Sequence, residues 1–166
     1  MAATACLFIL GYAAAVLQSS AGALLQVGLV RVDALAALLC WYSLRQDALY
    51  GAVFVVLFGL LISSFSIIPA YVFPLSYLLG FLTVRYIVSN VLELSSWQVY
   101  LMTGFVSMEI SVVQLAGSGS VDLVWPWGVL QAFVNVLTAP VLMAVFGRIE
   151  ALLKKLRKEK GELSTR

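Results

Sequence analysis

Polar side chains inside apolar segments are the residues of this 166-residue chain that are best placed to do chemistry. Glu109 lies in the run LMTGFVSMEISVVQL. A carboxylate inside a membrane-spanning helix is a functional-site hypothesis by default, and a buried structural Glu that locks two helices together is an equally weighted alternative. The next apolar run holds Gln131, Asn135 and Thr138, and the last two share a helical face because they are three residues apart. These three side chains are the candidate partners of Glu109, which predicts a polar seam between the two segments.

The stretch RVDALAALLCWYSLRQD begins with a pair of oppositely charged residues, Arg31 and Asp33. As a helix, the apolar part from Ala34 to Leu44 covers about 16 Å, whereas the hydrocarbon core of a membrane is about 30 Å thick. Either a longer span buries the charged pair, or residues 21–30 form a short re-entrant or interfacial piece and Asp33 caps a short span. We favour the second arrangement, because Asp is a good N-cap. Arg31 and Asp33 are then candidates for contact with a partner, and Asp47 is expected to cap the following helix.

No catalytic or metal-binding pattern accompanies these residues. The chain has no His, and it lacks the HExxH, GxSxG and P-loop motifs. Its two cysteines, Cys6 and Cys40, lie in apolar runs without the spacing of a metal site. We therefore expect a protein that is not an enzyme and has neither cofactor nor metal, with a carboxylate-based intramembrane enzyme as the remaining catalytic alternative.

The composition is that of a membrane protein. Hydrophobic residues make up 63% of the chain, charged residues make up 11%, and the mean hydropathy is +1.04, whereas soluble domains are roughly 45 to 50% apolar. Continuous apolar runs predict helices rather than barrel strands. We expect an all-α polytopic membrane protein with six spans. Five of them lie at about residues 2–17, 48–68, 71–88, 97–116 and 123–146. The remaining span, the second in the chain, ends at residue 44, and its start is ambiguous.

The basic residues predict the orientation. With six spans both termini share one side, and that side holds nine of the ten Lys and Arg residues, all except Arg31. The positive-inside rule makes it the cytoplasm. We divide the chain into a transmembrane domain, residues 1–148, and a basic helical tail, residues 149–166. The tail is expected to lie against anionic headgroups or to dock a cytoplasmic partner, and nucleic-acid binding is not expected.

Small residues and a proline mark the packing of the expected helices. Gly51 and Gly59 are eight residues apart and lie nearly on one face, and Gly80 and Gly104 add similar notches. Such notches suit close helix contacts, within this chain or with another. Pro140 lies inside the last expected span, where a kink is the ordinary consequence and a partner-binding face is the alternative.

Four stretches carry a resemblance to a known family: RVDALAALLCWYSLR, GAVFVVLFGLLISS, PLSYLLGFLTVRY and VNVLTAPVLMAVFGRIEALLKKLRK. Their order, in a six-span chain of this length, resembles the bacterial rod shape-determining protein MreD family from about Arg31 to the end. The resemblance implies a non-enzymatic component of the cell-elongation machinery in the bacterial inner membrane.

The resemblance also implies partners. Members bind MreC, and through it are linked to MreB filaments, to the RodA glycosyltransferase and to its penicillin-binding transpeptidase partner in peptidoglycan synthesis. The helices are thought to be similar to those of the S-components of energy-coupling-factor transporters. The alternative function is therefore that of an S-component that binds a small vitamin.

Overall fold

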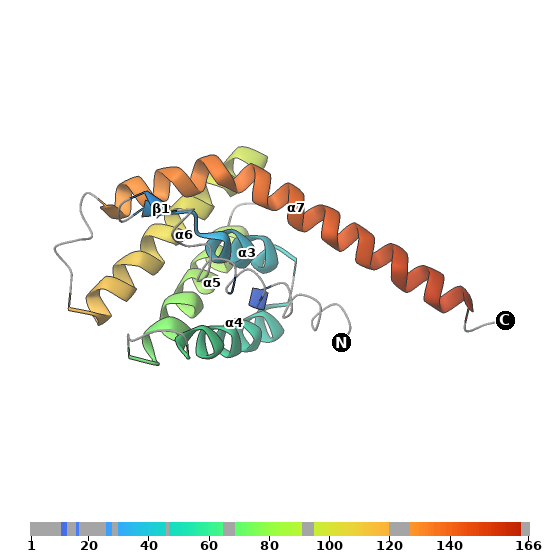
Figure 1. Cartoon of the computed structure of the whole chain (residues 1–166), viewed down its shortest axis with the longest axis horizontal. Coiled ribbons are helices and arrows are strands. Elements are labelled where there is room, and N and C mark those ends of the chain that lie inside the picture. The colour runs from blue at the N-terminus through green and yellow to red at the C-terminus, as the bar shows by residue number, and fades with distance from the viewer. Residues whose placement is uncertain are drawn as a thin grey trace.

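The computed structural model is a bundle of helices preceded by one short pair of strands (Figure 1). It describes residues 11–12, 16, 26–27, 30–45, 47–64, 69–90, 95–119 and 127–163. In chain order, its elements are β1 (Gln26–Val27), β2 (Val30–Arg31), α3 (Ala34–Ser43), α4 (Ala48–Ser63), α5 (Val72–Asn90), α6 (Ser96–Gly117) and α7 (Trp127–Leu163).

Three of these helices are long and apolar enough to cross a membrane: α5, α6 and residues 127–152 of α7. Helices α3 and α4 are apolar but shorter. Helices α4 to α7 coincide with the four last spans expected from the sequence, whereas most of the first expected span lies outside the described residues. The helical class is therefore confirmed, and three helices have the length and composition to cross a membrane. The six-span count and the placement of the termini remain predictions.

The described residues just before Asp33 form short strands and not a helix, which decides between the two arrangements of the second apolar run. Strands β1 and β2 are antiparallel, with Gln26 opposite Arg31 and Val27 opposite Val30. Because Arg31 has a strand conformation and α3 begins at Ala34, no continuous helix runs past the charged pair. The all-helical class is confirmed, and the two-residue strands β1 and β2 are a local exception to it.

Helix α3 occupies the centre of the bundle and contacts all four later helices (Figure 1). Every residue from Leu35 to Ser43 is buried. Ala36, Ala37 and Cys40 are completely inaccessible, because their small side chains let the neighbouring helices approach on several sides. A helix that is apolar all round is typical of a fully enclosed element.

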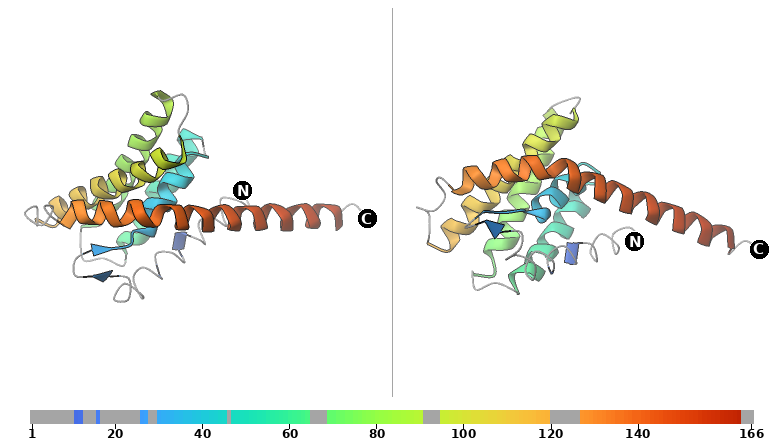
Figure 2. Two further views of the ribbon diagram at one scale, coloured as in Figure 1. Left: turned by 90° about the horizontal axis from the view of Figure 1, so that it is seen from above. Right: turned by 45° about the horizontal axis from the view of Figure 1, so that its top comes forward.

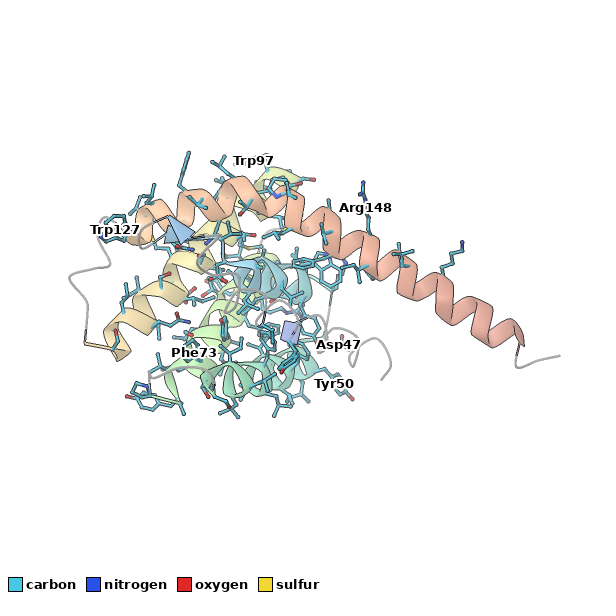
Figure 3. All side chains as sticks on the ribbon, viewed as in Figure 1. Asp47, Tyr50, Phe73, Trp97, Trp127 and Arg148 are labelled. Carbon is cyan, nitrogen blue, oxygen red and sulfur yellow. The ribbon has the colours of Figure 1, made fainter. Side chains whose placement is uncertain are left out.

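The four outer helices present apolar side chains to the outside at helical spacing. On α4 the exposed stripe includes Leu49, Val53, Leu57 and Leu60, and Tyr50 beside it points away from the bundle (Figure 3). Corresponding stripes are Leu75, Leu79, Leu82 and Tyr86 on α5; Trp97, Leu101 and Phe105 on α6; and Leu130, Phe133, Leu137, Val141 and Val145 on α7. Such stripes on helices of spanning length are what a lipid environment accommodates.

Helix α7 continues as a single helix of 37 residues with Pro140 inside it. It changes direction in its middle part (Figure 1), as expected where a proline removes a backbone hydrogen bond. Its C-terminal part extends beyond the other helices in both views of Figure 2. The basic tail is therefore a direct extension of the last span.

The four glycines singled out in the sequence all face neighbouring helices of this chain. Gly51 lies against Phe81, Gly80 against Val106, and Gly104 against the backbone of Ala132. Gly59 lies against the backbone of α5, because a Cβ added at this position would lie 2.6 Å from Cα of Pro74.

We predict that Gly59→Ala destabilises the bundle, since the backbone at Pro74 has no flexible end that can move away. Overpacking of this kind typically costs about 1 to 3 kcal/mol, which thermal unfolding of the detergent-solubilised protein will detect. Gly147→Ala in α7 is the matched control, because a Cβ there meets nothing within 4 Å. Equal unfolding midpoints for the two variants would contradict the close packing of α4 on the start of α5.

Candidate functional site

Asp33 caps the N-terminus of the central helix. Its Oδ1 accepts hydrogen bonds from the backbone N–H groups of Leu35 and Ala36, both at 3.1 Å. The first N–H groups of any helix lack partners within the helix, and this end of α3 lies inside the bundle, where Asp33 is 5% exposed. The expected N-cap is thus present, and its burial leaves Asp33 facing its own chain and not an outside partner.

Asn135 of α7 connects this cap to a third helix. Its Oδ1 accepts a hydrogen bond from the backbone N–H of Asp33 at 2.8 Å, and its Nδ2 donates to Oγ of Ser107 in α6 at 2.5 Å. Asn135 is 1% exposed and Ser107 is fully buried. The Asp33–Asn135–Ser107 network therefore joins α3, α6 and α7 through three buried residues.

The other end of α3 is held by two arginines. Nη1 of Arg85, from α5, donates to the backbone carbonyl of Ser43 at 3.3 Å. The guanidinium of Arg45, just after α3, lies 4.5 Å from the centre of the Trp41 ring, and its Nε is 3.3 Å from Oε2 of Glu150 in α7. A cation beside the last carbonyls of a helix is favourable. These contacts bring Arg45, Arg85 and the start of the basic tail to one end of the bundle.

Glu109 has a different partner from those expected. Oγ1 of Thr83 in α5 donates to its Oε1 at 3.0 Å, so the carboxylate joins α6 to α5 and not to α7. Its Oε2 is buried and accepts no hydrogen bond from the residues that the structure describes. The polar seam between α6 and α7 exists, but Ser107 and not Glu109 supplies its α6 side. The expectation fails because residues 107 and 109 point to different sides of α6.

The remaining candidates are dispersed. Gln131 is buried in α7, whereas Oγ1 of Thr138 donates to the carbonyl of Val134 in its own helix. Asp47 begins α4 but makes no side-chain capping bond. Arg31 takes part in the strand pair. Thr83 was not predicted from the sequence, because a single polar residue in an apolar run is not a distinctive signal. The contact of Arg85 with α3 was not predicted either, because the positive-inside rule treats this arginine only as a charge in a loop.

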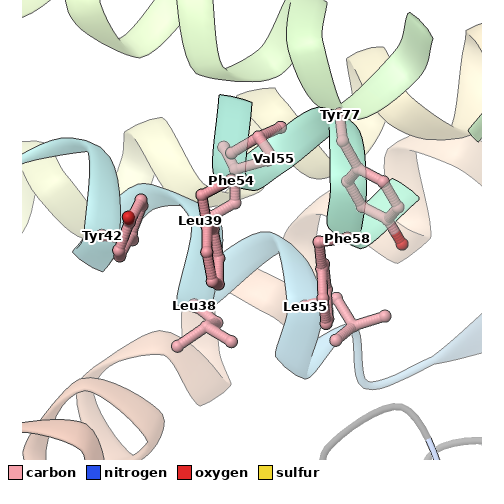
Figure 4. Close-up of a pocket in the computed structure, with 8 residues that line it drawn as sticks. All are labelled: Leu35, Leu38, Leu39, Tyr42, Phe54, Val55, Phe58 and Tyr77. Atoms are coloured by element: carbon pink, nitrogen blue, oxygen red, sulfur yellow. The ribbon is translucent and has the colours of Figure 1, made fainter. Parts of the chain in front are cut away.

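An apolar cavity of about 10 Å³ lies among α3, α4 and α5 (Figure 4). Eight side chains line it, four of them aromatic: Leu35, Leu38, Leu39, Tyr42, Phe54, Val55, Phe58 and Tyr77. Tyr42 stacks on Phe54 with ring centres 4.4 Å apart. The aromatic rings fill the space between the helices, and the volume left is just enough for one water molecule.

Comparison of the chain with protein-family models, with curated proteins and with solved structures finds no match. Among the described residues, no group of three or more Cys, Asp or Glu side chains is placed to hold a metal ion. The site is therefore defined by its own geometry. It consists of a buried network that fixes α3 and of a carboxylate between α5 and α6, one oxygen of which accepts no hydrogen bond from a described residue.

We predict that Asp33→Ala loosens α3 measurably, because it leaves two buried N–H groups without partners. Loss of an N-cap costs about 0.5 to 2 kcal/mol, and 1 to 2 kcal/mol corresponds to a factor of about 5 to 30 in the fraction that opens. Labelling of the inaccessible Cys40 by N-ethylmaleimide, in a Cys6→Ser background, measures that fraction.

Asp47→Ala is the matched control for this prediction, since Asp47 also precedes a helix but makes no side-chain capping bond. The control is expected to leave the labelling rate of Cys40 within about twofold of the parent, as for an ordinary surface substitution. Equal rates of Cys40 labelling in the two variants would contradict the capping role of Asp33.

Proposed function

We propose that this chain is a non-enzymatic, multi-pass component of the bacterial inner membrane that maintains rod shape. In this proposal it binds an MreC-like single-span protein and helps to organise peptidoglycan synthesis. MreB, RodA and the penicillin-binding transpeptidase are linked to it indirectly. The resemblance of its apolar segments to the MreD family is the starting point, and the geometry of the bundle supports a binding role.

The observation that carries the proposal is the contrast between the interior and the outside of the bundle. Inside, Asp33, Asn135 and Ser107 bond to one another or to the N-terminal end of α3. Outside, α4 to α7 present apolar stripes. Such surfaces are available to lipid and to other transmembrane helices, which associate through close packing and a few polar contacts. This arrangement suits a scaffold for membrane helices.

The S-component alternative requires room for a vitamin. Small-molecule sites usually enclose about 300 to 1,000 Å³, whereas the aromatic-lined cavity among α3, α4 and α5 measures about 10 Å³. Its lining is apolar apart from the hydroxyls of Tyr42 and Tyr77, and convergent polar groups are what orients a ligand. This cavity therefore has no room for a vitamin, which supports the scaffold role over the vitamin-binding role at this place in the bundle.

The extended end of α7 supports the expected orientation. Arg148 points away from the bundle (Figure 3), and the helix continues to Leu163 through the basic segment KKLRKEK. The ion pair between Arg45 and Glu150 lies where α7 leaves the other helices. A basic helix at this end is at the right place for the cytoplasmic membrane surface and its anionic lipids.

We expect the tagged chain, co-expressed with the MreC-like protein of the same bacterium, to retain that protein through affinity and size-exclusion steps in mild detergent. An unrelated single-span protein of similar length, expressed to the same level, is the control and is expected to be lost. Elution of the chain without the MreC-like protein, or with a tightly bound small molecule in its place, would overturn the proposal in favour of the S-component role.

A further inference from the structure

We propose that the tail helix, residues 148–163 at the end of α7, binds the anionic phospholipid headgroups of the membrane that α7 crosses. In this inference an apolar stripe of the tail helix inserts among the headgroups, and its basic residues are attracted to their phosphates. The inference goes beyond the proposed function, since it requires only that α7 spans a membrane and makes no use of the MreC-like partner.

The bundle covers α7 as far as Phe146. The ring of Phe146 is 8% exposed and lies against Trp41, with ring centres 6.0 Å apart. Beyond it, Arg148, Leu152 and Lys155 are exposed, and this part of α7 extends away from the other helices (Figure 2). The tail helix is therefore available to whatever surrounds this end of the bundle.

The length of α7 brings the tail helix to the membrane surface. Residues 127–146 of this 37-residue helix cover about 30 Å, which is the thickness of a hydrocarbon core, and residues 147–163 add about 25 Å. Because α7 changes direction in its middle part (Figure 1), the tail helix continues obliquely to the first half of α7. Its first turns consequently lie at the depth of the phospholipid headgroups.

The charge of the tail helix has the sign that attracts anionic headgroups. It contains six basic and three acidic residues, a net charge of +3. The acidic residue nearest to the bundle, Glu150, is already paired, because its Oε2 lies 3.3 Å from Nε of Arg45. Basic residues within a Debye length of an anionic surface are attracted to it. Those of the tail helix are Arg148, Lys154, Lys155, Arg157, Lys158 and Lys160.

An apolar stripe runs from the spanning part of α7 into the tail helix. Val141, Val145 and Leu152 are 66%, 44% and 61% exposed, and their separations of four and seven residues place them on one side of the helix. The same separations continue the stripe to the positions of Leu156 and Leu163. In water this stripe would stay exposed beyond the bundle, whereas at the membrane surface it is buried among headgroups and the upper parts of the acyl chains.

The combination of charge and stripe identifies the occupant as the lipid surface. A helix with an apolar stripe among Lys and Arg residues is typical of segments that lie in the membrane interface. Nucleic acid would match the charge but not the stripe, and an acidic soluble protein would have to displace the headgroups that already surround α7 where it leaves the membrane. Binding to lipid needs no second molecule from solution, because α7 holds the tail helix at the surface.

The test is the depth of the tail helix in lipid nanodiscs that contain the full chain. In the Cys6→Ser background, where Cys40 is inaccessible, Leu156→Cys is labelled with a fluorophore whose emission depends on polarity. We expect emission at shorter wavelength, and stronger quenching by lipids spin-labelled near the headgroup, in an equal mixture of phosphatidylcholine and phosphatidylglycerol than in phosphatidylcholine alone. The same fluorophore at Lys158→Cys is the matched control that is expected to be quenched less, because positions 156 and 158 are about 200° apart around the helix.

Two sets of charge variants test the role of the basic residues. Combined Lys154→Gln, Lys155→Gln and Lys158→Gln is expected to lower the ratio of bound to free tail helix about 100-fold in the mixture, since each basic residue near an anionic surface contributes about a factor of five. Combined Glu159→Gln and Glu162→Gln is the control that is expected to keep or strengthen the shift in emission. An unchanged midpoint of thermal unfolding verifies that each variant is folded.

Equal emission in the two lipid compositions, a shift unaffected by the three Lys→Gln replacements, or a water-exposed fluorophore at position 156 in the mixture would each overturn the inference. The last outcome would leave the tail helix to a soluble partner, such as an acidic protein or nucleic acid. Because these measurements contain no MreC-like protein, their failure leaves the proposed function standing, and loss of co-purification leaves the lipid contact standing.

Discussion

A ten-residue helix cannot end inside an apolar bundle unless its terminal peptide groups find partners. Helix α3 is about 15 Å long, half the thickness of a hydrocarbon core, and both of its ends lie against other helices. Asp33 supplies acceptors at the N-terminus, and Arg85 supplies a donor to Ser43 at the C-terminus. With these bonds formed, burial of the apolar side chains of α3 stabilises the bundle, and the energetic cost of burying unpaired backbone N–H and C=O groups is avoided. The arrangement of α5, α6 and α7 around α3 depends on this.

The sequence predicted most of the helices because apolar runs of spanning length have few other solutions in a membrane. It also predicted the N-cap, since the run after Asp33 is too short to cross alone and Asp is a strong cap. The strand pair before Asp33 was not predicted, because four residues with ordinary side chains carry no distinctive pattern. The close glycine contacts were recognised as notches, but their partners, such as Pro74 opposite Gly59, depend on how the helices pack.

The candidate site was predicted in composition and only partly in its connections. Asn135 and Glu109 were singled out because polar groups at that depth need partners. Their pairing was wrong, since the rotation of α6 decides which polar residue faces α7. At about 100° per residue, the two-residue separation places Ser107 and Glu109 about 200° apart around α6, so both cannot serve the same interface. The apolar periodicity that would fix this rotation is weak in α6, because apolar side chains occur both on its buried side and on its exposed side.

The glycine contacts and the polar network are parts of one constraint at the α6–α7 interface. Gly104 and Ser107 lie one turn apart on α6, opposite Ala132 and Asn135 on α7. Without a Cβ at residue 104, the backbone of α7 comes close enough for the short Asn135 side chain to bond Ser107 on one side and the Asp33 backbone on the other. A larger residue at 104 would separate the helices and remove Asn135 from one of its two partners. Close packing is therefore what makes the capped, enclosed α3 possible. Glu109, which is bonded to Thr83 and has a buried Oε2, takes no part in this network.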